Sequence, residues 1–239
     1  MRDVGHDVLV VAPADDRSGS SAAVGPVHMD DGIPVQRVEL GGLEGTPVYA
    51  IDAPPALCVL GAVLGAYGAP PELVVSGINR GPNTGASVLH SGTVGAALAG
   101  ANFGVSGVAV SIMWGEPSFL HTASSVAVAT LDWLAAEPAG SVLNVNVPNR
   151  ALSDISGVSQ AALARFGTVR AALREGESEA PVLEIRADGE ESAGDGTDTA
   201  LLAAGYVTVT SLAGVQSLPH GDAALALTKA LPGLGGSPK

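Results

Sequence analysis

The sequence is poor in aromatic residues and in cysteine, and each scarcity narrows what the chain can be. Phe, Trp and Tyr make up 3% of the 239 residues, although 46% are hydrophobic. We therefore expect a globular core built from small and β-branched side chains. The single cysteine, Cys58, excludes an internal disulfide framework and favours a reducing, cytoplasmic setting. It lies in an apolar segment and is interpreted as a core residue, because a reactive thiolate needs a polar, electropositive setting.

Basic residues and long apolar runs are also scarce. Lys and Arg number 11 against 24 Asp and Glu, which gives a net charge of −13. This balance argues against binding a nucleic-acid polymer through a broad basic face and is typical of a well-solvated surface. No segment reaches the roughly 18 uninterrupted apolar residues of a membrane span, so no membrane partner is expected. A local anion site stays open, since backbone N–H groups can supply positive potential.

The remaining pattern alternates apolar strands with apolar helices, which predicts an α/β fold with a mostly parallel sheet. Residues 6–13 form a continuous β-branched run and are predicted to be a fully buried strand. We expect residues 1–150 to form the α/β core, with a hairpin or arm at about 33–51. Residues 151–239 are expected to form a C-terminal hairpin, strand and helix region. Further strands are predicted within 72–77, 106–112, 141–148 and 203–212, and helices within 54–68, 91–104, 118–136 and 221–231.

Two polar loops follow predicted strands, at residues 14–21 and 77–91. Ligands of open α/β sheets bind beyond the carboxyl ends of the strands, where both loops are expected. Asn79 and Asn83 offer amide oxygens, and Ser91 is placed to cap a helix that begins near Gly92 and attracts an anion. The alternative is that these glycines and asparagines only form turns. The loops match neither the GxGxxG dinucleotide fingerprint, nor the phosphate loop, nor the GxSxG nucleophile elbow.

Five ordered motifs carry a resemblance to a known family. They are VVAPADDRSGSSAA, VVSGINRGPNTG, VLHSGTVGAALAG, LNVNVPN and GYVTVTSL, and they extend over nearly the whole chain. Together they resemble the SurE family of survival proteins, which are metal-dependent nucleotidases. The resemblance implies a Rossmann-like, three-layer α/β/α fold with a hairpin arm and C-terminal oligomerisation elements. It also implies a dimer or tetramer that hydrolyses nucleoside 5′-monophosphates, and 3′-monophosphates as a further option, with Mg²⁺ or Mn²⁺.

The resemblance also implies roles for particular residues. The family's metal is held by two aspartates of an NDDG motif, a serine and an asparagine. The serine and asparagine correspond to Ser18 and Asn79. Asn83 and the residues Ser91, Gly92 and Thr93 correspond to the neighbouring phosphate-binding wall. Hydroxyl and amide oxygens suit hard divalent cations, so the chemistry agrees with this assignment.

The departure from the family is the absence of an NDDG motif in residues 1–239. The family's first strand and most of its first helix have no counterpart here, so we expect a gap in the sheet. A start assigned too far downstream is the favoured explanation, since MRDVG resembles a helix end with its terminal glycine; a fragment and a degenerate family member are the alternatives. Asp15 and Asp16 are the nearest acidic pair and are interpreted as turn-capping residues.

Three functions compete. The leading one is a metal-dependent phosphomonoesterase of the 5′-nucleotidase or acid-phosphatase type, and the second is an inactive truncated member that acts as a binding or oligomeric module. The third is a dinucleotide-binding enzyme, but the polar loops of this sequence lack the GxGxxG fingerprint. No catalytic residue is assigned: His90 is as well suited to orienting the loop as to moving a proton. Trp114 and Trp133 are interpreted as core or interface residues, since lone aromatics usually pack.

Overall fold

A computed structural model describes residues 1–25, 32–167, 169–174, 182–187, 194–217 and 229–230. The helices are α1 (Pro55–Val63), α2 (Gly92–Ala101), α3 (Leu120–Ala136) and α4 (Asp198–Ala203), with short 3₁₀ segments η1 (Arg2–Val4), η2 (Gly85–His90) and η3 (Leu152–Asp154). The strands are β1 (Val10–Pro13), β2 (Val35–Arg37), β3 (Val48–Ile51), β4 (Leu73–Arg80), β5 (Ser106–Ile112), β6 (Val142–Val147), β7 (Gly157–Gln160), β8 (Val169–Arg174), β9 (Val182–Ala187) and β10 (Tyr206–Leu212).

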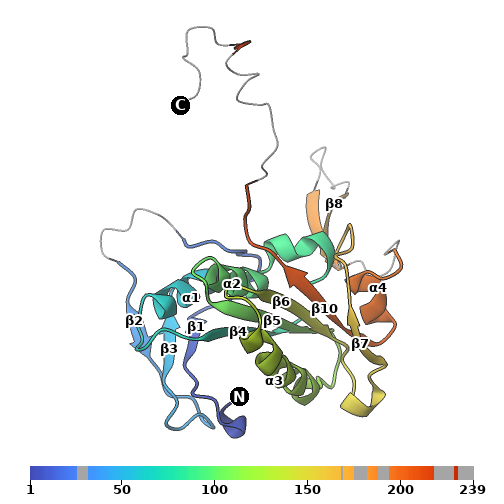
Figure 1. Ribbon diagram of the computed structural model, residues 1–239. Coiled ribbons are helices and arrows are strands. Elements are labelled where there is room, and N and C mark those ends of the chain that lie inside the picture. The colour runs from blue at the N-terminus through green and yellow to red at the C-terminus, as the bar shows by residue number, and fades with distance from the viewer. Residues whose placement is uncertain (26–31, 168, 175–181, 188–193, 218–228, 231–239) are drawn as a thin grey trace.

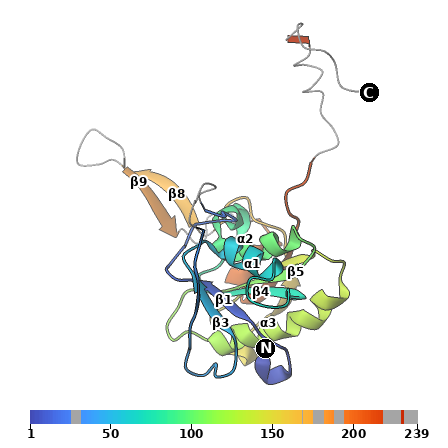
Figure 2. The ribbon, with the colours of Figure 1, turned by 90° about the vertical axis from the view of Figure 1, so that its left-hand side faces the viewer.

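The strands form three sheets. The five-stranded sheet has the order β4-β5-β6-β10-β7, the three-stranded sheet the order β1-β3-β2, and β8 and β9 form a separate hairpin. Strands β4, β5 and β6 are parallel to one another, whereas β10 is antiparallel to β6 and parallel to β7. Helix α2 covers one face of the central sheet and α3 covers the other, α1 packs against α2 and β1, and β8 and β9 project from the body (Figures 1 and 2). The molecule is therefore the predicted α/β fold with a mixed, mostly parallel central sheet.

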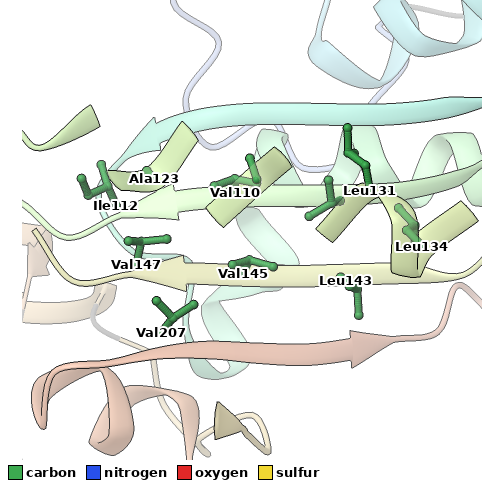
Figure 3. Close-up of a cluster of buried hydrophobic side chains, with 11 residues drawn as sticks. Val110, Ile112, Ala123, Leu131, Leu134, Leu143, Val145, Val147 and Val207 are labelled. Carbon is green, nitrogen blue, oxygen red and sulfur yellow. The ribbon is translucent and has the colours of Figure 1, made fainter. Parts of the chain in front are cut away.

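The main hydrophobic core lies between the sheet and α3. Alternate residues of the central strands point to this side, as the two-residue period of a strand requires. Figure 3 shows Leu143, Val145 and Val147 of β6 beside Val110 and Ile112 of β5 and Val207 of β10, facing Ala123, Leu131 and Leu134 of α3. Aliphatic side chains fill this interior, as the low aromatic content predicts.

The opposite face of the same strands is polar toward the carboxyl end of β6. Asn144 and Asn146 are fully buried there, together with Ser111 of β5 and Thr208 of β10. Val142, at the start of β6, instead joins a small apolar cluster with Val94, Ala97 and Ala109, of which the first two belong to α2. The alternation of Asn with Val in β6 thus separates an apolar core from a buried polar layer under the carboxyl-end loops.

Most predicted elements are confirmed, including α1, α2, α3 and the strands β5, β6 and β10. The alternating segments of the arm pair as antiparallel β2 and β3. The turn at Met1 is confirmed as a helix end, since Gly5 closes η1 with φ 95°. The predicted gap is also present: β1 and β4 each lie at the end of their own sheet and do not pair. The division into units 1–150 and 151–239 stays a prediction, and the predicted closing helix at 221–231 lies almost wholly outside the described residues.

Two predictions about local structure are wrong. The first strand is not fully buried: β1 covers Val10–Pro13 and its residues are half-buried or exposed, because it belongs to the small sheet. The loop predicted at 77–91 is mostly regular. Strand β4 continues to Arg80 through a register shift between Gly77 and Asn79, and η2 takes up residues 85–90. The glycines here favour a loop in the sequence, but β4 itself requires glycine at position 77. Gly77 has φ 128°, and a Cβ there would collide with Val110 O.

Candidate functional site

Three segments meet at the carboxyl ends of β1 and β4. We call residues 15–21, after β1, the serine loop and residues 81–86, after β4, the pinned turn. The third segment is the N-terminus of α2, which η2 connects to the pinned turn. The sequence-predicted residues belong to these segments or, as with Asn79, border them at the end of β4.

The pinned turn is held from below by the buried polar layer. Asn83 N donates to Asn146 Oδ1 at 2.7 Å, and Asn83 O accepts from Asn146 Nδ2 at 3.0 Å and from Asn144 Nδ2 at 2.8 Å. The Asn83 side chain donates to Ser111 Oγ at 2.7 Å. All these bonds point into the sheet, so Asn83 holds the turn in place, while its predicted contact with phosphate stays a prediction.

A buried carboxylate holds the other end of the turn. Asp198, the first residue of α4, is fully buried, and its Oδ2 accepts from Gly85 N at 2.8 Å. Its Oδ1 accepts from Ala164 N at 3.0 Å and from Thr199 N at 2.8 Å. Ala86 N also donates to Ala164 O at 3.1 Å. A buried charge is tolerated only when it is well hydrogen-bonded, so these backbone groups and Asp198 need one another.

Asn79 presents one free oxygen beside this turn. Its Nδ2 donates to Gly81 O at 2.8 Å, which fixes the orientation of the amide group. Within the described part of the chain, Oδ1 accepts no hydrogen bond. Arg80 follows directly; it is exposed and has no ion pair among the described residues. In a protein of net charge −13, an unpaired guanidinium here is a local attraction for an anion.

Residues 15–19 of the serine loop are exposed, and a local pair of bonds holds the start of the loop. Asp16 Oδ1 accepts from Ser18 N at 2.8 Å and from Ser18 Oγ at 2.6 Å. The side-chain bond first, and the backbone bond second, lower the pKa of Asp16 below its ordinary value. Asp16 therefore caps the turn, as predicted. Arg17 forms an ion pair with Asp52, which ties the loop to the end of β3.

The far end of the serine loop packs on α2. Ser21 N donates to His90 O at 3.3 Å and Ser21 Oγ donates to Leu89 O at 2.6 Å. Gly95 permits this approach, because a Cβ at that position would collide with the Ser21 carbonyl. His90 thus contacts the loop through its backbone, and its side chain is exposed.

The N-terminus of α2 has the features of an anion site. Ser91 Oγ accepts from Val94 N at 3.1 Å, which confirms the predicted N-cap. The amides of Gly92 and Thr93 find no acceptor among the described residues, as expected for a first helical turn. Ser20 Oγ is buried without a partner and lies 3.0 Å from the position a Gly92 Cβ would occupy. Two amides and an unpartnered hydroxyl therefore lie together at a positive helix end.

A divalent cation is poorly matched by the donors of the described residues. Ser18 Oγ and Asn79 Oδ1 are neutral, no hydrogen bond joins the two residues, and the described chain contains no group of three His, Cys, Asp or Glu side chains suited to a metal. Hard cations are held mainly by carboxylates, so this donor set is incomplete by itself.

Two further interpretations were tested by burial. Cys58 is 3% exposed in the α1 cluster, and burial raises the pKa of its thiol to about 11, so its interpretation as a core residue is confirmed. Trp114 and Trp133 are each 48% exposed, so neither belongs to the core. Among the described residues, no helix is both long and apolar enough to cross a bilayer.

Sequence reasoning did not single out Asn144, Asn146 or Asp198. The NVNV alternation in a strand predicted to be buried was a usable signal, because a buried asparagine requires a partner. Asp198 gave no such signal, since its bond to Gly85 joins residues 113 positions apart.

Comparison with known proteins identifies the family. The family model described as "Survival protein SurE" matches residues 1–171. A protein named 5′-nucleotidase SurE from Aeromonas hydrophila is 34% identical over 210 residues, covering 86% of this chain and 81% of the relative. One from Alkalilimnicola ehrlichii is 35% identical over 209 residues, covering 86% of this chain and 78% of the relative. The crystal structure of SurE from Aquifex aeolicus superposes with a TM-score of 0.71 at 26% identity, covering 96% of this chain and 90% of that one. The chain belongs to the SurE family.

Proposed function

We propose that this protein hydrolyses nucleoside 5′-monophosphates to a nucleoside and phosphate. The observation that carries the proposal is the α2 N-terminus, where the free amides of Gly92 and Thr93 meet the buried, unpartnered Ser20 hydroxyl. Backbone amides at a helix start bind a phosphoryl group without a basic side chain. The relatives' name, 5′-nucleotidase SurE, supplies the substrate class.

The chain's own residues suggest a division of labour. The amides of Gly92 and Thr93 hold phosphoryl oxygens, and Asn79 Oδ1 faces the reacting group. The pinned turn keeps β4 and α2 at a constant separation, because both of its ends are bonded to buried groups. Preorganised donors of this kind stabilise charge that develops in the transition state.

Dependence on Mg²⁺ or Mn²⁺ is a separate proposal, supported by the resemblance of Ser18 and Asn79 to family metal ligands. The incomplete donor set among the described residues favours the second candidate function, an inactive family member that acts as a binding or oligomeric module. Phosphate release from AMP and GMP, measured with Mn²⁺, with Mg²⁺ and with EDTA, separates the two. Metal-dependent release supports the nucleotidase; AMP binding without release by folded protein supports the inactive module.

We also propose that the protein self-associates as a dimer or tetramer. The end strand β7 carries Val158, which is 71% exposed, and the neighbouring Leu152 is 57% exposed. Exposed apolar side chains at a sheet edge are typical of contact surfaces. Sedimentation equilibrium tests this proposal, and a monomer at all concentrations would contradict it.

A further inference from the structure

We propose that Trp114 stacks against the nucleobase of the bound nucleotide and so distinguishes nucleotides from other phosphomonoesters. The inference rests on the proposed function, since it assigns the base-binding part of the same site.

The first observation is the position of Trp114. It lies two residues beyond the carboxyl end of β5, next to the carboxyl end of β4, where the strands are paired through Arg80 and Ile112. Gly81 N donates to Ile112 O at 2.8 Å, so the two strand ends stay bonded where their loops begin. Ligands of open α/β sheets bind at this edge.

The second observation is how the indole is held. A Cβ built on Gly81 would lie 2.6 Å from Trp114 Nε1, 2.8 Å from Cε2 and 3.0 Å from Cζ2. These similar distances mean that the ring lies across Gly81, whose φ of 126° also excludes most side chains. Gly81 O is the acceptor for Asn79 Nδ2 at 2.8 Å. Trp114 and Asn79 therefore share one neighbour, so the indole lies beside the residue that is proposed to face the reacting phosphoryl group.

The third observation is that the indole is presented on an anchored loop. Asn149 Oδ1 accepts from Phe119 N at 2.8 Å, its Nδ2 donates to Pro117 O at 3.2 Å, and Met113 N donates to Val147 O at 2.9 Å. Even so, 48% of Trp114 stays exposed. An aromatic ring that is fixed on one side and open on the other is suited to stacking a flat base, because every base offers a π-face.

Trp133 is a matched control within the same chain. It has the same exposure of 48%, but it lies near the end of α3. That helix runs back from the carboxyl end of β5, and Pro138 O, two residues beyond the helix, accepts from Ser106 Oγ at the start of β5 at 3.4 Å. Trp133 therefore lies at the opposite end of the sheet from the site.

The experiment compares AMP with ribose 5-phosphate, which has the same phosphate ester and no base. Trp114→Ala is expected to raise KM for AMP about tenfold, as loss of one aromatic–base stack implies, and to leave KM for ribose 5-phosphate unchanged. Trp114→Phe should restore KM for AMP to within about threefold of the wild-type value. Trp133→Phe should leave KM unchanged for both substrates. Equal effects on both substrates, or no effect on AMP, would overturn the inference.

A binding measurement separates this inference from the proposed function. The variant Trp133→Phe keeps Trp114 as its only tryptophan. Titration with adenosine, which has no phosphate, should quench the fluorescence of Trp114. Quenching without any phosphate release would leave the inference standing and refute the nucleotidase. Hydrolysis of AMP without quenching by adenosine would support the nucleotidase and overturn the inference about Trp114. Loss of self-association in Trp114→Ala, seen by sedimentation, would assign the indole to a subunit contact and also overturn the inference.

Discussion

The pinned turn and the serine loop contribute to the same edge of the molecule but are held by different forces. In the pinned turn, Asn83 and Gly85 bond to buried side chains of β6 and α4 that are distant in sequence. In the serine loop, Ser18 bonds to Asp16 two residues away, and both are exposed. The pinned turn is thus part of the fold, whereas the serine loop is a surface feature attached to it.

This difference separates stability from function. Buried polar groups that lose a partner carry their full desolvation cost, so substitutions beneath the pinned turn should lower the free energy of unfolding. Exposed loop bonds contribute little to stability, so substitutions in the serine loop should change ligand binding and leave the fold intact. The predictions below test this contrast, from the largest expected effect to the smallest.

Asp198→Ala should produce the largest loss. It leaves the amides of Gly85, Ala164 and Thr199 buried without an acceptor, which we expect to lower the free energy of unfolding by about 4 kcal/mol. Urea denaturation measures this as a lower midpoint at constant slope. The exposed Asp195→Ala in the same segment is the control and should stay within about 0.5 kcal/mol of wild type. Similar midpoints for the two variants would contradict the assignment.

Asn146→Ala should follow, with a loss of about 2–3 kcal/mol, since both the N–H and the carbonyl of Asn83 lose a buried partner. The same denaturation experiment measures it. Asn102→Ala, at the exposed end of α2, should be nearly neutral by comparison. A midpoint for Asn146→Ala equal to that of Asn102→Ala would mean that the polar layer does not hold the turn.

Ser18→Ala should reduce activity and leave stability nearly unchanged. We expect a change in unfolding free energy within about 0.5 kcal/mol and a fall of at least about tenfold in phosphate release from AMP. Ser153→Ala is a close control, because Ser153 Oγ donates to Asp154 Oδ1 at 3.0 Å on an exposed segment outside the site. Full activity in Ser18→Ala, or an equal loss in Ser153→Ala, would remove the serine loop from the site.

The smallest effect concerns the pKa of Asp16. Hydrogen bonds from Ser18 lower this pKa, so their contribution is present above the ordinary value of 3.8 and is lost as the pH falls through the lowered value. Carboxyl NMR titration should show the pKa of Asp16 rising toward 3.8 in Ser18→Ala, where the side-chain bond is gone. An unchanged pKa in that variant would show that the bond is not made in solution.

The sequence predicts the regular elements well because their signals are local. Apolar runs such as those of β5 and β6 and the Ser91 cap of α2 depend on neighbouring residues. The serine loop was also predictable in part, since Asp16 caps a turn with Ser18 at short range. What connects these elements was not predictable, because the Asp198 bond to Gly85 and the Asn146 bonds to Asn83 appear only when distant segments meet.

Errors arose where glycine and tertiary context override a local pattern. Residues 77–81 read as a loop because Gly77 and Gly81 break the apolar run, yet β4 continues to Arg80 with a register shift. The first strand reads as fully buried because its β-branched residues are continuous, but its place in a three-stranded sheet leaves it partly open. Trp114 illustrates the same limit: a lone aromatic side chain usually packs in the interior, whereas the position of Trp114 beyond β5 leaves half of it exposed.

The most direct test of the proposed nucleotidase site measures both activity and stability in one variant, Asn79→Ala. Asn79 donates one bond to Gly81 and otherwise presents its oxygen to the site, so the account predicts an unfolding midpoint within about 1 kcal/mol of wild type. It also predicts at least a tenfold loss of phosphate release from AMP, with Mn²⁺ or Mg²⁺ present for both proteins. Full activity in stable Asn79→Ala, or no release by folded wild type under these conditions, would contradict the proposed nucleotidase site.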